Sequence, residues 1–358
     1  MIYKVIGLMS GSSLDGLDIA YVHLEEIAGV WNFAIINTIC KLYEPKIKRS
    51  LEDAINLSAL DYNLLHSDYG HYLGTEINDF IKENKLEHQV DFIASHGHTT
   101  FHIPQRMTHQ LGNGAAIAAE AGLPVICDLR ALDVAMGGQG APIVPIGDKW
   151  LFKDYNYFLN LGGIANVSII DTEQISAFDV CPANRVLNML AGEKGMEYDK
   201  EGALSSSGKV NEELLDRLNE LEYYALDAPK SLSNSFGTDV VYPLIKSFGL
   251  PVEDALRTYT EHIAFQIAKA FDAIKTNTNN KVFTTGGGAF NTFLISKLNE
   301  HLERLHLQIF VPSPEIVQYK EALVIAFMGA LRWREEFNVL KAVTGAKQDS
   351  ISGALWLV

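Results

Sequence analysis

The stretch "SGSSLDGLD" near the start of the chain contains only glycine, serine and aspartate besides two leucines. The backbone N–H groups of Gly11, Ser12 and Ser13 could converge on one anion, as in the nests that bind phosphate. Asp15 and Asp18 would repel a phosphate directly, so carboxylates beside such a nest predict Mg²⁺ held through water. The stretch is neither a P-loop nor a Rossmann fingerprint, because it lacks both glycine patterns. A polar β-turn is the alternative interpretation.

Two later glycine turns have a similar character. "LGGIAN" offers a second nest at Gly162 and Gly163, with the amide of Asn166 as donor or acceptor. "TTGGGAFN" follows a predicted strand and precedes a predicted helix, where glycines let a charged ligand approach the helix N-terminus. The glycines of this third loop are Gly286, Gly287 and Gly288. A Gly-Gly turn alone also forms tight hairpins, but three such loops at strand ends together predict a nucleotide site.

Histidines gather in "ASHGHTTFH", just after a predicted buried strand. His96 and His98 have the H-x-H spacing that can ligate a metal. No matching Cys/His/Asp cluster occurs elsewhere in the sequence, so we expect His96 to hydrogen-bond a sugar hydroxyl instead.

The segment "AFDVCPAN" places Asp179 at the end of a predicted strand. A carboxylate there could act as a general base toward water or a hydroxyl. The local sequence favours instead a cap for the helix that begins in "CPANRVLNML". Cys181 has no evident partner base, which argues against a thiol nucleophile.

The elements that must position these residues mix strands and helices. "KVIGLMS" and "DIAYVHLEE" are predicted strands on either side of the first turn. Residues 155–171 repeat this strand–turn–strand pattern, and residues 50–85 and 251–275 have helical spacing of apolar residues. The two similar hairpins indicate two related α/β domains that face each other across a cleft.

Length and composition agree with a two-domain enzyme, since 358 residues are too many for one simple core. We expect an N-terminal lobe of residues 1–131 and 342–358 and a C-terminal lobe of residues 132–341. The net charge of -15 argues against nucleic acid and anionic membrane as partners. No apolar run approaches the roughly 20 residues of a membrane helix, and no secretion signal is evident. We therefore expect a cytoplasmic enzyme, and a homodimer only by analogy with other such enzymes.

Taken in order along the chain, the motifs resemble those of anhydro-N-acetylmuramic acid kinases. They include "GLMSGSSLDGLDIA", "SHGHTTFHIP", "CDLRALDVAMGGQGAPIVP", "NLGGIANVS", "FDVCPAN" and "TTGGGAFN", and the resemblance runs from Gly7 to "TGA" at 344–346. It implies an actin/hexokinase-like (ribonuclease H-like) α/β fold with ATP and sugar in the interdomain cleft. It also implies a peptidoglycan-recycling kinase that opens the 1,6-anhydro ring of anhydro-N-acetylmuramic acid with water and phosphorylates O6.

The same resemblance assigns roles to residues. It makes Gly11 to Asp18 the ATP phosphate segment. Together with the two later glycine turns, the expected ATP-binding residues are Gly11, Ser12, Ser13, Leu14, Asp15, Gly16, Leu17, Asp18, Gly162, Gly163, Asn166, Gly286, Gly287 and Gly288. Asp179 becomes the base that activates water, in preference to a helix cap, and His96, Gln139 and Asn184 are expected to contact the sugar. Because O6 leaves toward phosphorus, one carboxylate can suffice where glycoside hydrolysis usually needs two.

The chain departs from the family pattern beside the implied base. Where the family has "FDTGPGN", this chain has "FDVCPAN", with Cys181 and Ala183 in place of glycines, and His98 stands in place of a glutamine. These changes leave open a kinase of an open amino sugar such as N-acetylglucosamine, in which Asp179 would deprotonate the sugar hydroxyl. A non-catalytic sugar or nucleotide sensor of the same fold is a third hypothesis, against which the retained Asp179 argues.

Overall fold

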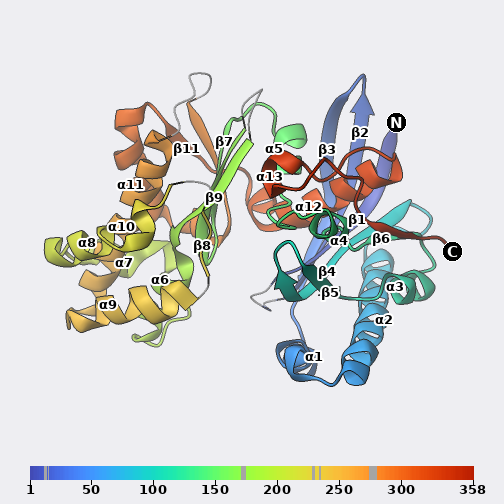
Figure 1. Ribbon diagram of the computed structural model, residues 1–358, viewed down its shortest axis with the longest axis horizontal. Coiled ribbons are helices and arrows are strands. Elements are labelled where there is room, and N and C mark those ends of the chain that lie inside the picture. The colour runs from blue at the N-terminus through green and yellow to red at the C-terminus, as the bar shows by residue number, and fades with distance from the viewer. Residues whose placement is uncertain (12–13, 15, 171–174, 228–229, 234, 274–279) are drawn as a thin grey trace. The chain divides into compact units, whose positions relative to one another are not determined.

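A computed structural model describes residues 1–11, 14, 16–170, 175–227, 230–233, 235–273 and 280–358 of the chain (Figure 1). Its backbone packing divides the chain into two compact units. The first unit comprises Met1–Lys153 and Tyr319–Val358, and the second comprises Asp154–Gln318. In the described ranges, no helix combines the length and the apolar character needed to cross a membrane.

These boundaries differ from the expected lobe boundaries at residues 131 and 341. Helix α5 (Pro145–Leu151) belongs to the first unit because it packs closely on helix α12 (Pro314–Trp333). Lys320 Nζ lies 2.6 Å from Asp148 Oδ1 in a buried ion pair. A methyl group added at Gly147 would lie 2.3 Å from Val324, so the two helices approach without room for a side chain.

The first unit is built on a sheet with the order β12-β6-β4-β1-β2-β3, and β5 pairs with β4. Its strands are β1 (Ile2–Ser10), β2 (Leu17–Ile27), β3 (Val30–Lys41), β4 (Phe92–Ile103), β5 (Met107–Leu111), β6 (Val125–Cys127) and β12 (Ala354–Trp356). β1 pairs with β4 in parallel and with β2 in antiparallel orientation. Both central strands carry runs of consecutive buried residues, as expected for strands covered on both faces.

Helices supply the rest of the core of this unit. They are α1 (Pro45–Glu52), η1 (Ala54–Asn56), α2 (Ala59–Glu83), α3 (Gly114–Ala121), α4 (Ala131–Ala135), α5, α12 and α13 (Lys341–Thr344). α2 and α3 pack side by side (Figure 1). Helix α12 lies directly against the central strands, because a methyl group at Gly7 would fall 2.1 Å from the carbonyl oxygen of Ala322 and one at Gly329 would fall 2.6 Å from Ala94.

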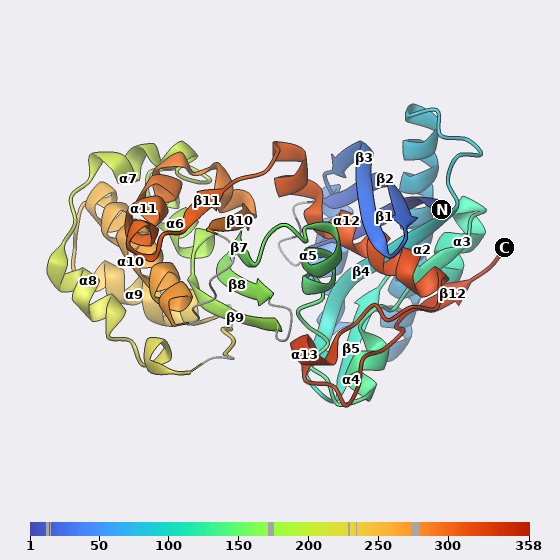
Figure 2. The same ribbon diagram turned by 90° about the horizontal axis from the view of Figure 1, so that it is seen from above.

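The second unit contains a five-stranded sheet with the order β11-β10-β7-β8-β9. The strands are β7 (Tyr157–Leu161), β8 (Ile164–Ile170), β9 (Ile175–Pro182), β10 (Lys281–Thr285) and β11 (Gln308–Phe310). Figure 2 shows β7, β8 and β9 side by side as one antiparallel meander. In chain order, both sheets begin with three antiparallel strands and add two parallel strands on the other side of the first, β4 and β6 in the first unit and β10 and β11 in the second. The first sheet also has β5 and β12, which pair antiparallel with β4 and β6. This shared topology confirms the predicted α/β fold of two related halves.

Helix α10 forms the centre of the second unit, with twelve of its residues buried. The helices of this unit are α6 (Asn184–Gly192), η2 (Lys200–Gly202), α7 (Ala203–Ser207), α8 (Glu212–Asn219), η3 (Glu222–Ala225), η4 (Phe236–Val241), α9 (Tyr242–Ser247), α10 (Val252–Asp272), η5 (Gly287–Phe290), α11 (Thr292–Leu302) and η6 (Glu303–Leu305). Leu256, Ile263 and Ile267 of α10 belong to one apolar cluster with the inner faces of β7, β8 and β9. This core fixes the strand ends at which the predicted site residues lie.

Candidate active site

The first predicted phosphate loop connects β1, which ends at Ser10, to β2, which begins at Leu17. The backbone N–H of Leu14 donates to the carbonyl of Gly11 at 3.2 Å, and Leu14 has a positive φ of 56° with its side chain buried. Gly11 and Leu14 are therefore joined directly at this end of the hairpin. Ser12, Ser13 and Asp15, which the prediction assigns to the same loop, lie outside the described residues.

Packing explains one of the loop glycines. A methyl group at Gly16 would lie 2.7 Å from the carbonyl oxygen of Lys41, so β3 itself requires glycine there. Asp18 lies within β2, opposite Met9 on one side and Cys40 on the other. In the part of the chain that the structure describes, no group of three or more histidine, cysteine, aspartate or glutamate side chains could hold a metal ion.

The two histidines of the H-x-H pair lie inside a strand, since β4 continues to Ile103 where the sequence predicts a strand that ends near His96. β5 pairs with the second half of β4 and so extends it. His98 is buried and its Nδ1 lies 3.1 Å from Ser10 Oγ, while Tyr43 donates to the same hydroxyl at 2.7 Å. Burial lowers the pKa of His98, which suits a neutral hydrogen-bonding residue behind the phosphate loop.

His96 is held by Arg130. The Nε of Arg130 donates to His96 Nε2 at 2.8 Å, so Nδ1 carries the proton and donates to the carbonyl of Gly97 at 2.9 Å. Burial, and then the charge of Arg130, lower the pKa of His96 to about 3. His96 is therefore neutral at physiological pH. Both ring nitrogens are occupied by protein partners, which leaves no lone pair for a metal.

Asp133 organises the glycine-rich loop of the "GGQGAP" segment. Its Oδ2 accepts from the N–H of Gly140 at 2.8 Å, and its Oδ1 accepts from the hydroxyl of Thr344 at 2.6 Å. Arg130 donates a further hydrogen bond to the carbonyl of Gly140 at 2.6 Å. The backbone N–H of Gln139 donates to the carbonyl of Thr344, and the residue itself is exposed. The predicted sugar residue Gln139 thus sits on a loop that is fixed from three sides.

In the second unit, the Gly162–Gly163 turn meets the start of α6. The backbone N–H groups of Ala183 and Asn184 donate to the carbonyls of Gly163 and Gly162 at 2.8 and 3.1 Å. A methyl group at either glycine would meet nothing closer than 3.4 Å. Neither packing nor a positive φ of the chain requires glycine at these two positions. The open backbone is what a phosphate nest needs.

The triple-glycine loop lies against the same turn. Gly286 has a φ of 83°, and a methyl group there would fall 2.5 Å from Asn160 Oδ1. At Gly288 a methyl group would lie 2.7 Å from Leu161, whereas at Gly287 the nearest atom is Asn184 Nδ2 at 3.7 Å. Packing therefore fixes the outer two glycines and leaves the middle one open.

Asn184 connects these two loops. Its Nδ2 donates to the carbonyl of Leu161 at 2.8 Å, and its Oδ1 faces Gly288. The structure thus brings together two of the three predicted glycine loops and the predicted sugar residue Asn184 at one edge of the sheet.

Asp179 lies in β9, opposite Asn166 of β8. The local expectation of a helix cap is wrong: the N-cap of α6 is Ala183, which makes no side-chain cap bond. Instead, Asp179 Oδ2 accepts from the N–H of Leu232 at 2.8 Å. Burial raises the pKa of Asp179, and the Leu232 hydrogen bond partly offsets that shift. A raised pKa in a half-exposed carboxylate is a property of general bases.

The two residues beside Asp179 that replace family glycines have their side chains in the core. Cys181 and Ala183 are fully buried and belong to the apolar cluster of the second unit. Burial raises the pKa of the Cys181 thiol, so it is not a nucleophile at neutral pH. These two side chains change the packing under the turn and do not line an open surface of their unit.

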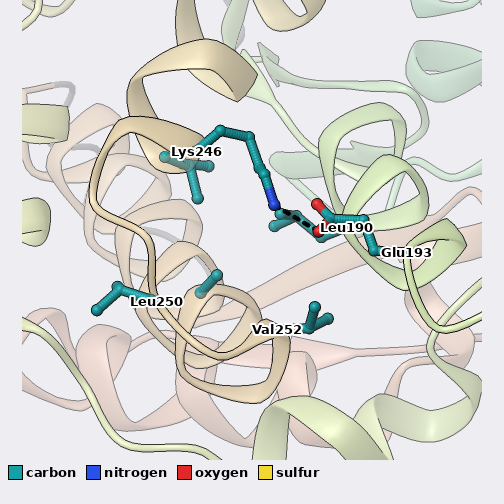
Figure 3. A pocket seen from close by; sticks show the side chains of 7 residues that line it. Leu190, Glu193, Lys246, Leu250 and Val252 are labelled. Atoms are coloured by element: carbon teal, nitrogen blue, oxygen red, sulfur yellow. Dashed lines mark hydrogen bonds and ion pairs between the residues drawn. The ribbon is translucent and has the colours of Figure 1, made fainter.

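Away from these residues, a small hollow lies between α6, α9 and the start of α10 (Figure 3). It is lined by Leu190, Glu193, Ile245, Lys246, Leu250, Val252 and Ala255. Lys246 Nζ pairs with Glu193 Oε2 at 2.5 Å across its mouth. None of the predicted site residues lines it, and the Lys246–Glu193 pair links α9 to the end of α6.

Sequence reasoning missed several residues that the structure places at the site. Arg130, Asp133 and Thr344 support the histidine and the glycine-rich loop, and Tyr223 contacts the backbone of Asp179. Arg130 stands within a quoted motif as a lone cation beside many apolar residues, and that was the one available signal. The others become meaningful only through contacts between distant segments.

Comparisons with known proteins agree on one family. The sequence profile described as anhydro-N-acetylmuramic acid kinase matches residues 3–357. The anhydro-N-acetylmuramic acid kinase of Shewanella pealeana is 32% identical over 377 residues, covering 98% of each chain. That of Vibrio parahaemolyticus is 31% identical over 367 residues, covering 98% of this chain and 97% of the relative. A solved structure titled as the activator of the 2-hydroxyisocaproyl-CoA dehydratase from Clostridium difficile resembles the chain distantly, with a TM-score of 0.45, 16% identity and coverage of 94% and 97%. The match over nearly the whole chain confirms the family predicted from the motifs: the chain belongs to the anhydro-N-acetylmuramic acid kinases.

Proposed function

We propose that this chain hydrolyses the 1,6-anhydro ring of anhydro-N-acetylmuramic acid and phosphorylates O6 with ATP, giving N-acetylmuramic acid 6-phosphate and ADP. Membership of the family supports the reaction as a whole. The observation that carries the proposal is Asp179: one carboxylate oxygen is bound by Leu232, and the other has no partner among the described residues. With respect to the described residues, that oxygen can accept a proton.

A water oxygen forms a bond to the anomeric carbon while its proton passes to Asp179, and the bond from that carbon to O6 breaks. O6 then bonds to the γ-phosphorus as the bridging bond to ADP breaks. Because phosphorus captures O6, no separate acid is needed at the leaving oxygen.

The glycine turns of the second unit fit the phosphates of ATP. The open backbones of Gly162, Gly163 and Gly287 can approach an anion closely, and Asn184 holds the two loops together. In the first unit we assign the remaining phosphate contacts to Gly11–Asp18, and the sugar contacts to His96 and Gln139. Both ring nitrogens of His96 already have protein partners, so His96 could hydrogen-bond the sugar only after Arg130 moves away from it.

Mg²⁺ would be held mostly by water and by the phosphates of ATP, since no group of three or more His, Cys, Asp or Glu side chains among the described residues could hold it. Asp18 is the described carboxylate that would assist it, with Asp15 as the second candidate. Bound there, Mg²⁺ would neutralise charge on the transferring phosphoryl group.

The test is mass spectrometry of the product formed from ATP, Mg²⁺ and the anhydro sugar in ¹⁸O-labelled water. We expect a phosphorylated open sugar that carries one label, and about 10²–10⁴-fold slower formation by Asp179→Asn. Unlabelled product incubated in the same water for the same time controls for exchange at the anomeric carbon. Turnover of N-acetylglucosamine without turnover of the anhydro sugar would contradict the proposal.

A further inference from the structure

Residues 223–232 hydrogen-bond the backbone and the carboxylate of Asp179. Its backbone N–H donates to the carbonyl of Lys230 at 3.0 Å. Its backbone carbonyl accepts from the hydroxyl of Tyr223 at 2.6 Å, and its carboxylate accepts from the N–H of Leu232 at 2.8 Å. Tyr223 lies in η3, and Lys230 and Leu232 follow shortly after it.

The position of β9 makes this arrangement unusual. β9 is the last strand of its sheet, so Lys230 and Leu232 occupy the place of a further strand. In an ordinary ladder the N–H of Leu232 would seek a main-chain carbonyl. Here Tyr223 already occupies the carbonyl of Asp179, and Leu232 donates to the carboxylate instead.

Tyr223 is itself held in place. Lys230 Nζ donates to the carbonyls of Tyr223 and Leu226 at 3.2 and 3.0 Å and lies 4.6 Å from the Tyr223 ring centre. The ring also packs against Phe236 at 5.6 Å. The side chain is buried, with 8% of its surface exposed. Such a phenol has little freedom to leave the carbonyl of Asp179.

We propose that Tyr223 is a positioning residue for the base: by holding the Asp179 carbonyl, its hydroxyl directs the Leu232 N–H to the carboxylate and leaves one carboxylate oxygen to receive the proton from water. This inference deepens the proposed function and rests on it for its catalytic meaning. Tyr223 touches no reacting atom in this scheme.

The effect of losing the hydroxyl follows from the hydrogen bonds of Asp179. Among the described residues of its unit, Tyr223 is the titratable residue that contacts Asp179, and Lys230 and Cys181 are the titratable neighbours of Tyr223. In Tyr223→Phe the Leu232 N–H is free to bond the carbonyl, and the carboxylate loses the hydrogen bond that offsets its burial. The pKa of Asp179 then rises, because the charged form has lost its donor.

The experiment is a carboxyl ¹³C NMR titration of Asp179 in the full chain, with Asp179→Asn used to assign the resonance. We expect the pKa of Asp179 to rise by about 1 unit in Tyr223→Phe. Tyr224→Phe is the matched control, since this neighbouring tyrosine is also buried and its hydroxyl contacts His262 Nε2 at 3.0 Å instead. An unchanged pKa of Asp179 in Tyr223→Phe, or an equal rise in both variants, overturns the inference.

The pH dependence of kcat/KM supplies the catalytic readout. The base must be deprotonated, so the acidic limb in Tyr223→Phe should move to higher pH by the same 1 unit or so, with about tenfold loss below it and near recovery at pH 8. A purely structural role would lower the rate at every pH. If the pKa of Asp179 shifts in Tyr223→Phe but the unsubstituted chain does not turn over the anhydro sugar, Tyr223 still positions Asp179 and the proposed function is wrong. If the unsubstituted chain turns over the anhydro sugar but the pKa of Asp179 does not shift in Tyr223→Phe, the proposed function stands and the inference about Tyr223 is wrong.

Discussion

Replacing Asp133 tests the account of the glycine-rich loop most directly. Asp133 is 1% exposed, and its carboxylate accepts from the Gly140 N–H and the Thr344 hydroxyl. A hydrogen bond to a charged group contributes about 1.5–3 kcal/mol, so Asp133→Ala should lower the free energy of unfolding by about 3–6 kcal/mol. Asp133→Asn is the matched control. Its amide oxygen can still accept from Gly140 and its amide nitrogen can donate to Thr344, so we expect a loss of about 1–2 kcal/mol.

Tryptophan fluorescence suits the assay because all four tryptophans lie in the first unit, which contains Asp133. Urea unfolding followed at their emission therefore reports that unit selectively. Far-ultraviolet circular dichroism follows both units in the same samples. We expect the fluorescence transition to move to lower urea in Asp133→Ala.

Two outcomes would contradict this role of the Asp133 hydrogen bonds. One is an Asp133→Ala transition within about 1 kcal/mol of that of the unsubstituted chain, which would mean that the two hydrogen bonds contribute little. The other is an equal loss in Asp133→Ala and Asp133→Asn, which would make the negative charge, and not the donor geometry, the source of stability.

Three further predictions concern other parts of the site. Gly286→Ala should lower the free energy of unfolding by about 1–3 kcal/mol and weaken ATP binding in calorimetry, because Gly286 has a positive φ and the added methyl group would clash. Gly287→Ala is the control: its methyl group meets nothing within 3.4 Å, so it should leave the stability unchanged. The ring resonances of His96 should show no titration between pH 5 and 9, and an inflection there would contradict its pKa of about 3. Lys320→Met should destabilise the first unit by about 3–5 kcal/mol at pH 8. Burial raises the pKa of Asp148, and Lys320 opposes that shift. Without the lysine, the Asp148 carboxylate binds a proton more tightly in the folded state than in the unfolded state, so the loss of stability should be smaller at pH 5 than at pH 8. A loss that is the same at both pH values in fluorescence-detected urea unfolding would contradict this prediction.

The local elements could be predicted from the sequence because their signals are short in range. Apolar segments on either side of a glycine turn predicted both hairpins, which the structure has as β1–β2 and β7–β8. The helix expected over residues 251–275 is α10, Val252–Asp272. Two hairpins of one kind were enough to predict two related halves, and the matching strand orders confirm it.

What the sequence could not give depends on contacts across long separations. The carboxylate of Asp179 meets Leu232 rather than the nearby helix start, and Asp133 meets Thr344 near the other end of the chain. No periodicity links such residues. β4 runs past its expected end for the same reason, since its second half depends on pairing with β5. The sequence predicted candidate reactive residues, but it did not predict the residues that hold them in position.

The discontinuous first unit has a consequence for synthesis on the ribosome. Tyr319–Val358 supplies most of α12, which packs on the central strands, and β12, which covers β6. Until those residues emerge, the nascent first unit exposes an apolar sheet face and an unpaired strand edge, both hazards for aggregation. The second unit is contiguous and is complete before them. We therefore expect the second unit to fold before the first during synthesis, and the N-terminal segment to be the part most exposed to aggregation while translation continues.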